Sequence, residues 1–363
     1  MANQVFEDII AFHASWIVVN SVQGCPSSCR YCFLAPRGLT NTVPIELCSP
    51  AEAISKLLAY PHYNQDIPIC FLTATDPFAS PLTIKHTEGL LAEMKRRNLP
   101  NLACVVTKKL IPKAAMAALQ SYGNIIVYLS YSALDNRIER GVQNRDILEN
   151  FKNLHKAGIK IIHYWRPFLP QNAVLQTLRS VMEEVAPYAE ASVIAGLKIH
   201  DKMLNNMDFW SEAALAYHNN PQAEGFWPKG VRRNLAQLMD SLSHPLYMRN
   251  LCAIDYALKR PNRMGFYAAD CDECAHCPVS QKELCQNFID SCDFSRRHIL
   301  KILEDFKLEA SYDEKTRIIS VDSDISQPLA WTVRAATHCA VVAQHPTDTL
   351  LNTSITGAVP VEV

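Results

Sequence analysis

Apolar runs rich in β-branched residues alternate with helix-like segments along the first 200 residues of the 363-residue chain. Each run has the length of a buried strand, and the segment after it carries apolar residues every three to four positions. Six strands separated by helices predict parallel βαβ units, arranged either as a barrel or as an open doubly wound sheet. We predict the strands at residues 16–20, 67–73, 102–107, 125–131, 159–164 and 191–195.

Signals at the ends of the helices support this alternation. Ser49 followed by Pro50 is typical of a helix start, and Gly123 and Gly158 are typical of helix ends. Beyond residue 200 the alternation fades into isolated elements. The helices are predicted at 50–60, 83–97, 112–122, 146–157, 174–185, 208–217, 231–242 and 297–307, and one late strand at 316–321.

Three cysteines, Cys25, Cys29 and Cys32, follow the first predicted strand within eight residues. Thiolates select zinc, copper(I) or iron–sulfur clusters. A [4Fe–4S] cluster is usually held by four cysteines, so three ligands leave one iron open to bind a substrate or cofactor. Structural zinc sites are instead closed by four ligands and usually begin with a Cys-x2-Cys pair. The spacing of three residues and then two therefore favours an iron–sulfur cluster.

This Cys-x3-Cys-x2-Cys spacing, with Tyr31 just before the third cysteine, resembles the signature of the radical S-adenosylmethionine (SAM) superfamily. In that superfamily the open iron binds the amino and carboxylate groups of SAM, and one electron cleaves SAM into methionine and a 5′-deoxyadenosyl radical, which abstracts hydrogen from the substrate. The resemblance implies that Cys25, Cys29 and Cys32 are the catalytic and metal-binding residues. It also implies that Tyr31 and Phe33 lie at the cofactor.

The same resemblance implies an α/β fold with a partial (β/α)6 TIM-type barrel in residues 1–200. The cluster loop would follow the first strand, and SAM would lie across the carboxyl ends of the strands. This placement agrees with the general rule that loops at the carboxyl ends of barrel strands carry the chemistry.

Polar residues stand at the ends of the second, third and fourth predicted strands. The glycine-glycine-glutamate motif of the superfamily is absent, and the segment that contains Thr73, Thr75 and Asp76 is similar instead to that of the spore photoproduct lyase branch. The resemblance implies that these residues bind the cofactor, that Lys108 approaches the SAM carboxylate and that Ser130 contacts SAM. Threonine and aspartate before a proline also suit a turn, which is the alternative for the second strand end.

Three further residues belong to this set of expectations. Arg166, after the fifth strand, is expected to bind a cofactor or substrate carboxylate through two hydrogen bonds, with a structural arginine as the alternative. Gly196, after the sixth strand, lies where the superfamily contacts adenine through its backbone, although a simple glycine turn explains it too. Lys109 is the second candidate for the contact assigned to Lys108.

A second group of cysteines lies in the C-terminal half, which we predict as a mainly helical, cysteine-rich extension over residues 201–363. Its Cys-x2-Cys-x2-Cys-Pro run resembles the ferredoxin-type run that binds a [4Fe–4S] cluster. A zinc site built from the same cysteines, with His276 as a further candidate ligand, is the main alternative. The predicted ligands are Cys271, Cys274, Cys277 and Cys285, with Cys292 as the alternative fourth ligand.

The other cysteines have no ligand-like spacing and are expected to be small buried residues. They are Cys48, Cys70, Cys104, Cys252 and Cys339. A chain with 13 cysteines, no basic-then-apolar leader and no apolar run of membrane length fits a cytoplasmic protein whose cysteines serve metal or redox chemistry. Its 35 basic and 36 acidic residues give a net charge of −1, which disfavours a general attraction to nucleic acid or to a membrane.

These observations favour a radical SAM enzyme that abstracts hydrogen from a small-molecule, nucleotide or peptide substrate and takes electrons from a flavodoxin or ferredoxin. A DNA-repair enzyme like spore photoproduct lyase is one alternative. That family uses a cysteine near the second strand end, where residues 73–77 have none and Cys70 lies earlier. A non-catalytic iron–sulfur protein is the other alternative, and the presence of Thr75, Lys108 and Ser130 disfavours it.

Overall fold

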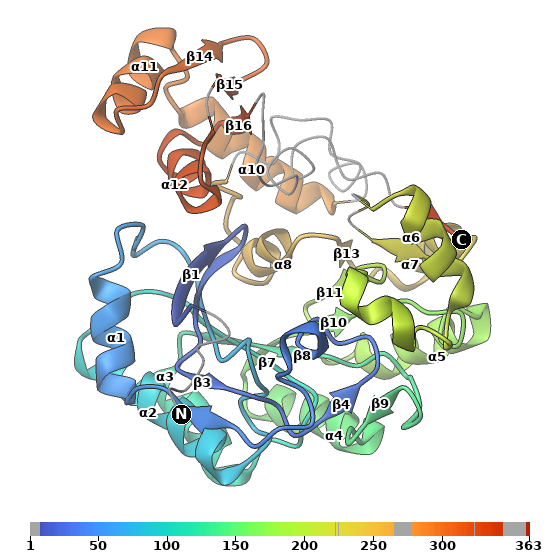
Figure 1. Cartoon of the computed structure of the whole chain (residues 1–363). Helices are drawn as coiled ribbons and strands as arrows, with labels where there is room; N and C mark the ends of the chain where they lie inside the picture. Colours follow the sequence, from blue (N-terminus) through green and yellow to red (C-terminus); the bar gives the residue numbers. More distant parts are fainter. Residues whose placement is uncertain (1–7, 222, 224, 265–276, 323, 344–360) are drawn as a thin grey trace.

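The fold is that of a computed structural model, which describes residues 8–221, 223, 225–264, 277–322, 324–343 and 361–363. Its centre is an eight-stranded sheet (Figure 1) in the order β1-β2-β6-β7-β8-β10-β11-β13. β1 pairs with β2 in antiparallel fashion, and all the other neighbours are parallel. The strands are β1 (Ile10–His13), β2 (Trp16–Val19), β6 (Ile69–Phe71), β7 (Ala103–Thr107), β8 (Ile125–Leu129), β10 (Lys160–Trp165), β11 (Ala191–Ile194) and β13 (Leu246–Tyr247).

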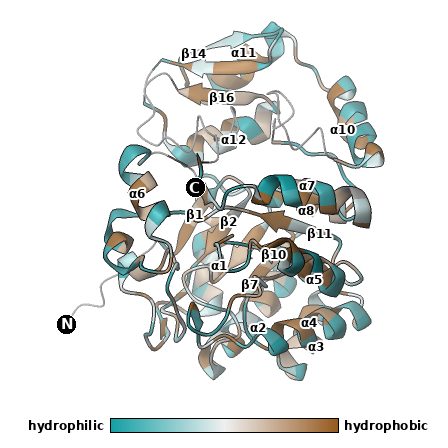
Figure 2. Cartoon of the chain, turned by 90° about the vertical axis from the view of Figure 1, so that its right-hand side faces the viewer, coloured by the Kyte–Doolittle hydropathy of each residue, from teal (hydrophilic) through white to brown (hydrophobic). Residues whose placement is uncertain are grey.

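All six predicted strands are present, and the prediction of an α/β fold with a parallel sheet is confirmed. Five helices connect them and pack around the sheet (Figure 1), and Figure 2 shows the apolar colour concentrated on the strands and on the helix sides that face them. α1 begins at a capping box in which Ser49 and Glu52 satisfy each other's backbone N–H groups. The helices are α1 (Pro50–Leu58), α2 (Pro81–Arg96), α3 (Lys113–Tyr122), α4 (Asn144–Lys156) and α5 (Leu175–Val185).

The main sheet continues past residue 200, where we expected the first domain to end. β13 adds to β11, and α7 (Val231–Leu242) and α8 (Asn250–Ala257) share the core of the sheet. β13 has only two residues, which is too short for a strand to be recognised in a sequence, and the four-residue β1 was also not predicted.

The C-terminal region contains helices together with a second, three-stranded sheet in the order β14-β15-β16. The helix predicted at 297–307 and the strand predicted at 316–321 are confirmed as α11 and β15, whereas the sheet as a whole was not predicted. α12 contacts β1, and in Figure 1 the small sheet lies beyond β1 and α8, at the far end of the molecule from β4 and β9. The elements are α10 (Val279–Ser291), α11 (Arg296–Asp305), β14 (Ala310–Asp313), β15 (Ile318–Val321), α12 (Gln327–Thr337) and β16 (Ala340–Ala343).

Short elements outside the main sheet complete the fold. Two of them, β4 (Ser28–Cys29) and β9 (Glu139–Arg140), form an antiparallel pair. Within the described ranges, no helix has the length and apolar character needed to cross a membrane. The remaining elements are β3 (Val22–Gln23), η1 (Ala35–Arg37), β5 (Ile45–Glu46), η2 (Asp201–Asn206), α6 (Ser211–Asn219), β12 (Phe226–Trp227) and β17 (Val361–Glu362).

Candidate cofactor site

The three-cysteine loop lies at the carboxyl end of β2, between β3 and η1. It begins at Gly24, whose φ of +100° is rarely adopted by other residues, and an added Cβ there would lie 2.9 Å from Thr42 Oγ1. Backbone hydrogen bonds then fix the loop: Cys25 N donates to Leu39 O at 2.7 Å and Cys32 N donates to Cys29 O at 3.2 Å. The position of the cysteines is therefore set by the backbone.

The three thiols are largely buried. Cys25 and Cys32 pack on a small apolar group that includes Leu34 and Leu39, and Cys29 is 9% exposed. Burial raises the pKa of Cys25 to about 11 and that of Cys29 to about 12, and it also raises the pKa of Cys32. Within the described residues, no three His, Cys, Asp or Glu side chains already converge as a metal site. The donor set itself, three thiols on one loop, fits the ligation of an iron–sulfur cluster with one open iron.

A buried glutamate lies directly opposite the second cysteine. Glu139 in β9 is the Cα partner of Cys29 in β4, so the two side chains stand on the same face of this strand pair. The glutamate is 1% exposed. The sequence analysis missed Glu139, because a carboxylate nine residues beyond Ser130, in a charged segment, has the pattern of a solvated loop. Only the pairing of β4 with β9 brings it to the cysteine loop.

Three side chains donate hydrogen bonds to the same oxygen of this glutamate, Glu139 Oε1. Lys108 Nζ donates at 2.8 Å, Ser132 Oγ donates at 2.6 Å, and the Tyr31 hydroxyl donates as well. Lys108 Nζ also donates to the backbone oxygen of Ser130 at 3.1 Å. Lys108 and Ser130, predicted from separate strand ends, and Tyr31 from the cysteine loop thus meet around one carboxylate. Their predicted contacts with SAM stay predictions.

The carboxylate of Asp76 is held entirely by the protein. Its Oδ1 accepts hydrogen bonds from Thr107 Oγ1 at 2.8 Å and Phe78 N at 2.9 Å, and its Oδ2 accepts from Lys108 N at 2.8 Å. Burial raises the pKa of Asp76 although these hydrogen bonds oppose the shift. Asp76 therefore ties the second strand end to the third, which agrees with the turn alternative for this segment.

The two threonines of the same segment are also bound within the protein. The Thr75 hydroxyl donates to the backbone oxygen of Gly24, next to the first cysteine of the loop. Thr73 Oγ1 donates to Asn20 Oδ1 at 3.0 Å. The second strand end thus supports the cysteine loop, and its predicted role in cofactor binding stays a prediction.

The other predicted site residues are more scattered. Phe33 is 46% exposed, with the Arg37 guanidinium 5.8 Å from its ring centre. Lys109 Nζ donates to the backbone oxygen of Gly141, away from Glu139, which favours Lys108 for the central position. The Arg166 guanidinium lies 3.6 Å from the centre of the Tyr164 ring.

Close packing explains the glycine at position 196. An added Cβ there would lie 2.5 Å from Phe226 O and 2.7 Å from Trp227 Cδ1. The backbone of β12 and the indole ring therefore approach too closely for any larger residue. The predicted adenine contact at Gly196 stays a prediction.

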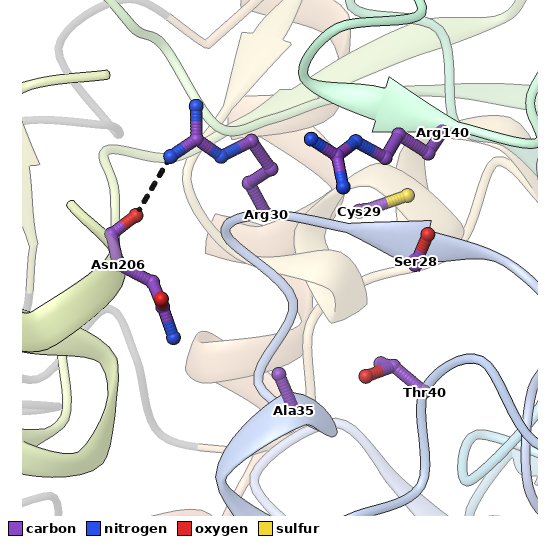
Figure 3. Close-up of a pocket in the computed structure, with 7 residues that line it drawn as sticks. All are labelled: Ser28, Cys29, Arg30, Ala35, Thr40, Arg140 and Asn206. Carbon is purple, nitrogen blue, oxygen red and sulfur yellow. Dashed lines mark hydrogen bonds between the residues drawn. The ribbon is translucent and has the colours of Figure 1, made fainter. Parts of the chain in front are cut away.

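A pocket of about 260 Å³ opens beside the second cysteine (Figure 3). Arg140, in β9, and Arg30, the residue directly after β4, lie next to each other above it. Arg30 donates to Asn206 O at 3.1 Å and pairs with Asp208. The pocket is lined by Ser28, Cys29, Arg30, Ala35, Thr40, Arg140 and Asn206.

The C-terminal ligand prediction falls partly outside the described residues, because Cys271, Cys274 and His276 lie in the segment that the structure leaves out. Cys277 Sγ lies 3.4 Å from the Tyr247 hydroxyl. Cys285, on α10, accepts a hydrogen bond from Asn262 N at 3.4 Å.

Cys252 and Cys292 differ in their relation to these two thiols. Cys252 shares the surroundings of Cys277 and Cys285. Its sulfur lies 4.0 Å from Asn262 Nδ2, and burial raises the pKa of Tyr247 with added contributions from Cys277 and Cys252. Cys292 lies instead at the end of α10, where burial raises its pKa and the charges of Arg263 and Arg317 oppose the shift.

The remaining cysteines largely follow the expectation of burial. Cys70, Cys104 and Cys339 are 0% exposed, whereas Cys48 and Cys252 are only half-buried. Burial raises the pKa of Cys339 to about 11.

Comparison with known proteins gives a match to one family model and to several solved structures. Residues 19–173 match the model of the radical SAM superfamily. No curated protein matches the chain in sequence. A spore photoproduct lyase variant shares the fold with a TM-score of 0.52 and 11% identity, over 68% of this chain and 79% of that one. Another variant, with bound dinucleoside spore photoproduct, gives 0.51 and 11% over the same shares.

A third solved structure, Streptococcus suis SuiB bound to S-adenosylmethionine, aligns more weakly. The identity is 16% and the TM-score is 0.42, over 57% of this chain and 48% of SuiB. The chain therefore spans about half the length of SuiB. It also spans 65% of a spore photoproduct lyase chain solved with AdoMet and dinucleoside spore photoproduct.

Proposed function

We propose that this chain is an enzyme that reductively cleaves SAM at a [4Fe–4S] cluster, because its residues 19–173 match the model of the radical SAM superfamily. Cys25, Cys29 and Cys32 would hold three irons. The bound cluster and SAM would supply the electron transfer and the 5′-deoxyadenosyl radical that removes hydrogen from a small-molecule, nucleotide or peptide substrate. We interpret the main sheet as the partial (β/α)6 barrel of this family.

The observation that carries this proposal is the meeting of the cysteine loop with the ends of the neighbouring strands. Lys108 from the end of β7, the backbone oxygen of Ser130 from the end of β8, and Tyr31 from the loop converge beside Cys29. An ammonium group buried at this point would attract the carboxylate of a zwitterionic cofactor. The carboxyl ends of parallel strands are also where α/β folds of this type place their reactions.

Burial of the loop supports the same role in a second way. Burial raises the pKa of all three thiols, Tyr31 packs against the core, and the loop backbone is fixed at Gly24, Cys25 and Cys32. A site that makes a carbon radical must exclude water and competing hydrogen donors, and must hold the reacting carbon at a fixed place. These tasks fall to the residues of the chain.

Anaerobic reconstitution tests the proposal directly. With dithionite and SAM, the wild-type protein should form 5′-deoxyadenosine, and Cys25→Ala and Cys32→Ala should lose both the iron and the product. Cys48→Ala is a suitable control, because this half-buried cysteine lies outside the loop. Undiminished 5′-deoxyadenosine from Cys32→Ala protein would refute the mechanism. Bound iron without any SAM cleavage by wild-type protein would favour the non-catalytic iron–sulfur protein.

We further propose a second metal site, with a [4Fe–4S] cluster as its occupant and zinc as the rival. Cys271, Cys274, Cys277 and Cys285 remain the proposed ligands. The placement of Cys285 and Cys277 around a shared set of residues, with Cys292 elsewhere, supports Cys285 as the fourth ligand. Two clusters would give about eight irons per chain, whereas one cluster and a zinc site would give about four irons and one zinc.

An electron donor of the flavodoxin or ferredoxin type would reduce the cluster. The guanidinium group of Arg140, which lines the opening beside Cys29, supports the binding of an anionic group there, either from such a donor or from a substrate with a phosphate or carboxylate (Figure 3). Repair of DNA is the less favoured alternative. Cys70, the cysteine nearest to the second strand end, is 0% exposed within β6.

A further inference from the structure

Two buried carboxylates flank the cysteine loop, and they differ in how completely the protein satisfies them. Both oxygens of Asp76 accept hydrogen bonds from neighbouring residues. Glu139 receives all its hydrogen bonds on Oε1, and its Oε2 is buried without a partner in the described part of the chain. A buried acceptor left unsatisfied costs about 1–3 kcal/mol, and more when it is charged. Glu139 Oε2 is therefore the carboxylate oxygen that a bound group would complete.

A second buried atom without a partner belongs to the cysteine loop. Ser27 Oγ, within the cysteine loop itself, is also buried without a hydrogen-bond partner among the described residues. Lys108 Nζ makes two hydrogen bonds, to Glu139 and to Ser130 O, while an ammonium group has three N–H donors. The described site thus has an acceptor, a hydroxyl and a donor to spare beside Cys29.

An unpartnered carboxylate oxygen next to an ammonium group with a spare N–H matches a ligand that carries both an amino group, which donates hydrogen bonds, and a carboxylate, which accepts them. We propose that Glu139 and Lys108 form a receptor for the amino-acid end of the cofactor, with Glu139 binding the α-amino group and Lys108 the α-carboxylate. Glu139 would thereby replace the acidic motif that the second strand end lacks. This inference rests on the proposed function and adds Glu139 to it as a binding residue.

The arrangement also has a physical logic when no cofactor is bound. Glu139 is 1% exposed, and an isolated charge at such a buried position is strongly unfavourable. The ion pair with Lys108 compensates this charge.

Binding measurements on reconstituted, cluster-containing protein test this assignment independently of turnover. The probes are SAM, a SAM analogue without the α-amino group, and decarboxylated SAM, and the readout is the dissociation constant from anaerobic equilibrium dialysis. Glu139→Gln should weaken SAM binding about 10- to 100-fold, the range for loss of a hydrogen bond to a charged group, and should leave the affinity for the deaminated analogue unchanged. Glu184→Gln serves as the matched control, because Glu184 also accepts a tyrosine hydroxyl, from Tyr131 at 2.9 Å.

The reciprocal variant guards against a folding defect. Lys108→Gln should weaken the binding of SAM and of the deaminated analogue, and should leave decarboxylated SAM unchanged. An equal loss of affinity for all three probes in both variants would mean a structural role only and would overturn the assignment, as would unchanged SAM binding by Glu139→Gln protein. If wild-type protein with about four irons per chain bound no SAM, the proposed function itself would fail.

Discussion

Replacing Lys108 by methionine should reveal how much the ion pair with Glu139 contributes to folding. The Lys108 Nζ to Glu139 Oε1 distance is 2.8 Å, and the side chains are 16% and 1% exposed. Removing one partner of a buried pair costs about 3–5 kcal/mol, since the other charge stays buried without compensation. We expect a loss of about 3 kcal/mol, near the lower limit, because Lys108 keeps some contact with water.

Urea unfolding of the cluster-free protein, followed by circular dichroism, measures this loss without any contribution from the cofactor. Lys160→Met is the control, because Lys160 and Glu190 lie 3.6 Å apart with about two fifths of each side chain exposed, and such a surface pair contributes less than about 1 kcal/mol. The double variant Lys108→Met/Glu139→Gln should recover part of the loss, because it removes the uncompensated charge. A loss below about 1 kcal/mol for Lys108→Met alone would refute the description of a tightly coupled buried pair.

Three other variants test separate parts of the structure. Gly24→Ala places a Cβ 2.9 Å from Thr42 Oγ1 at a φ of +100°. It should lower the free energy of unfolding in urea by about 1–3 kcal/mol and lower the iron content after reconstitution. Full iron content would contradict the requirement for glycine. Cys285→Ser should lower the metal content of the C-terminal site, measured by elemental analysis, whereas Cys292→Ser should not; the opposite result would exchange the two ligands. Burial raises the pKa of Asp255 to about 7, so the folded protein keeps this proton up to a higher pH than the unfolded chain does. The free energy of unfolding should therefore fall as the pH rises from about 4 to 7. Asp255→Asn should flatten that part of the stability profile, and an unchanged slope would argue against the raised pKa.

The sequence predicted the individual strands of the main sheet better than it predicted how far along the chain the sheet extends. Every predicted strand of the main sheet is present, because each is a continuous apolar run buried on both faces and bounded by turn or helix-start residues. β13 escaped prediction because two residues, Leu246 and Tyr247, carry no periodicity, and only their register against Ser192 and Val193 makes them a strand. The sheet therefore extends beyond the expected boundary at residue 200.

The parts of the candidate site that depend on local sequence were predicted, and the part that depends on long-range pairing was not. The spacing of Cys25, Cys29 and Cys32 is local, so the sequence alone indicated an iron–sulfur cluster. The meeting of Lys108 with the end of β8 followed from the βα alternation, since the carboxyl ends of neighbouring parallel strands share one edge. The position of Glu139 depends on the pairing of two-residue strands more than 100 residues apart, for which the sequence contains no pattern.

Asp76 and Glu139 show why residue type and position along the chain could not decide which acid serves the cofactor. Asp76 follows the second strand, where the family resemblance directs attention, yet the structure uses both its oxygens to join Phe78, Thr107 and Lys108. Binding a ligand at Asp76 would require breaking hydrogen bonds that hold the strand ends together, each contributing about 1 kcal/mol or more. Glu139 Oε2 has no hydrogen bond among the described residues that a donor from a ligand would have to replace. The unsatisfied oxygen, and not the proximity to the expected motif, thus identifies the acid that is available for binding.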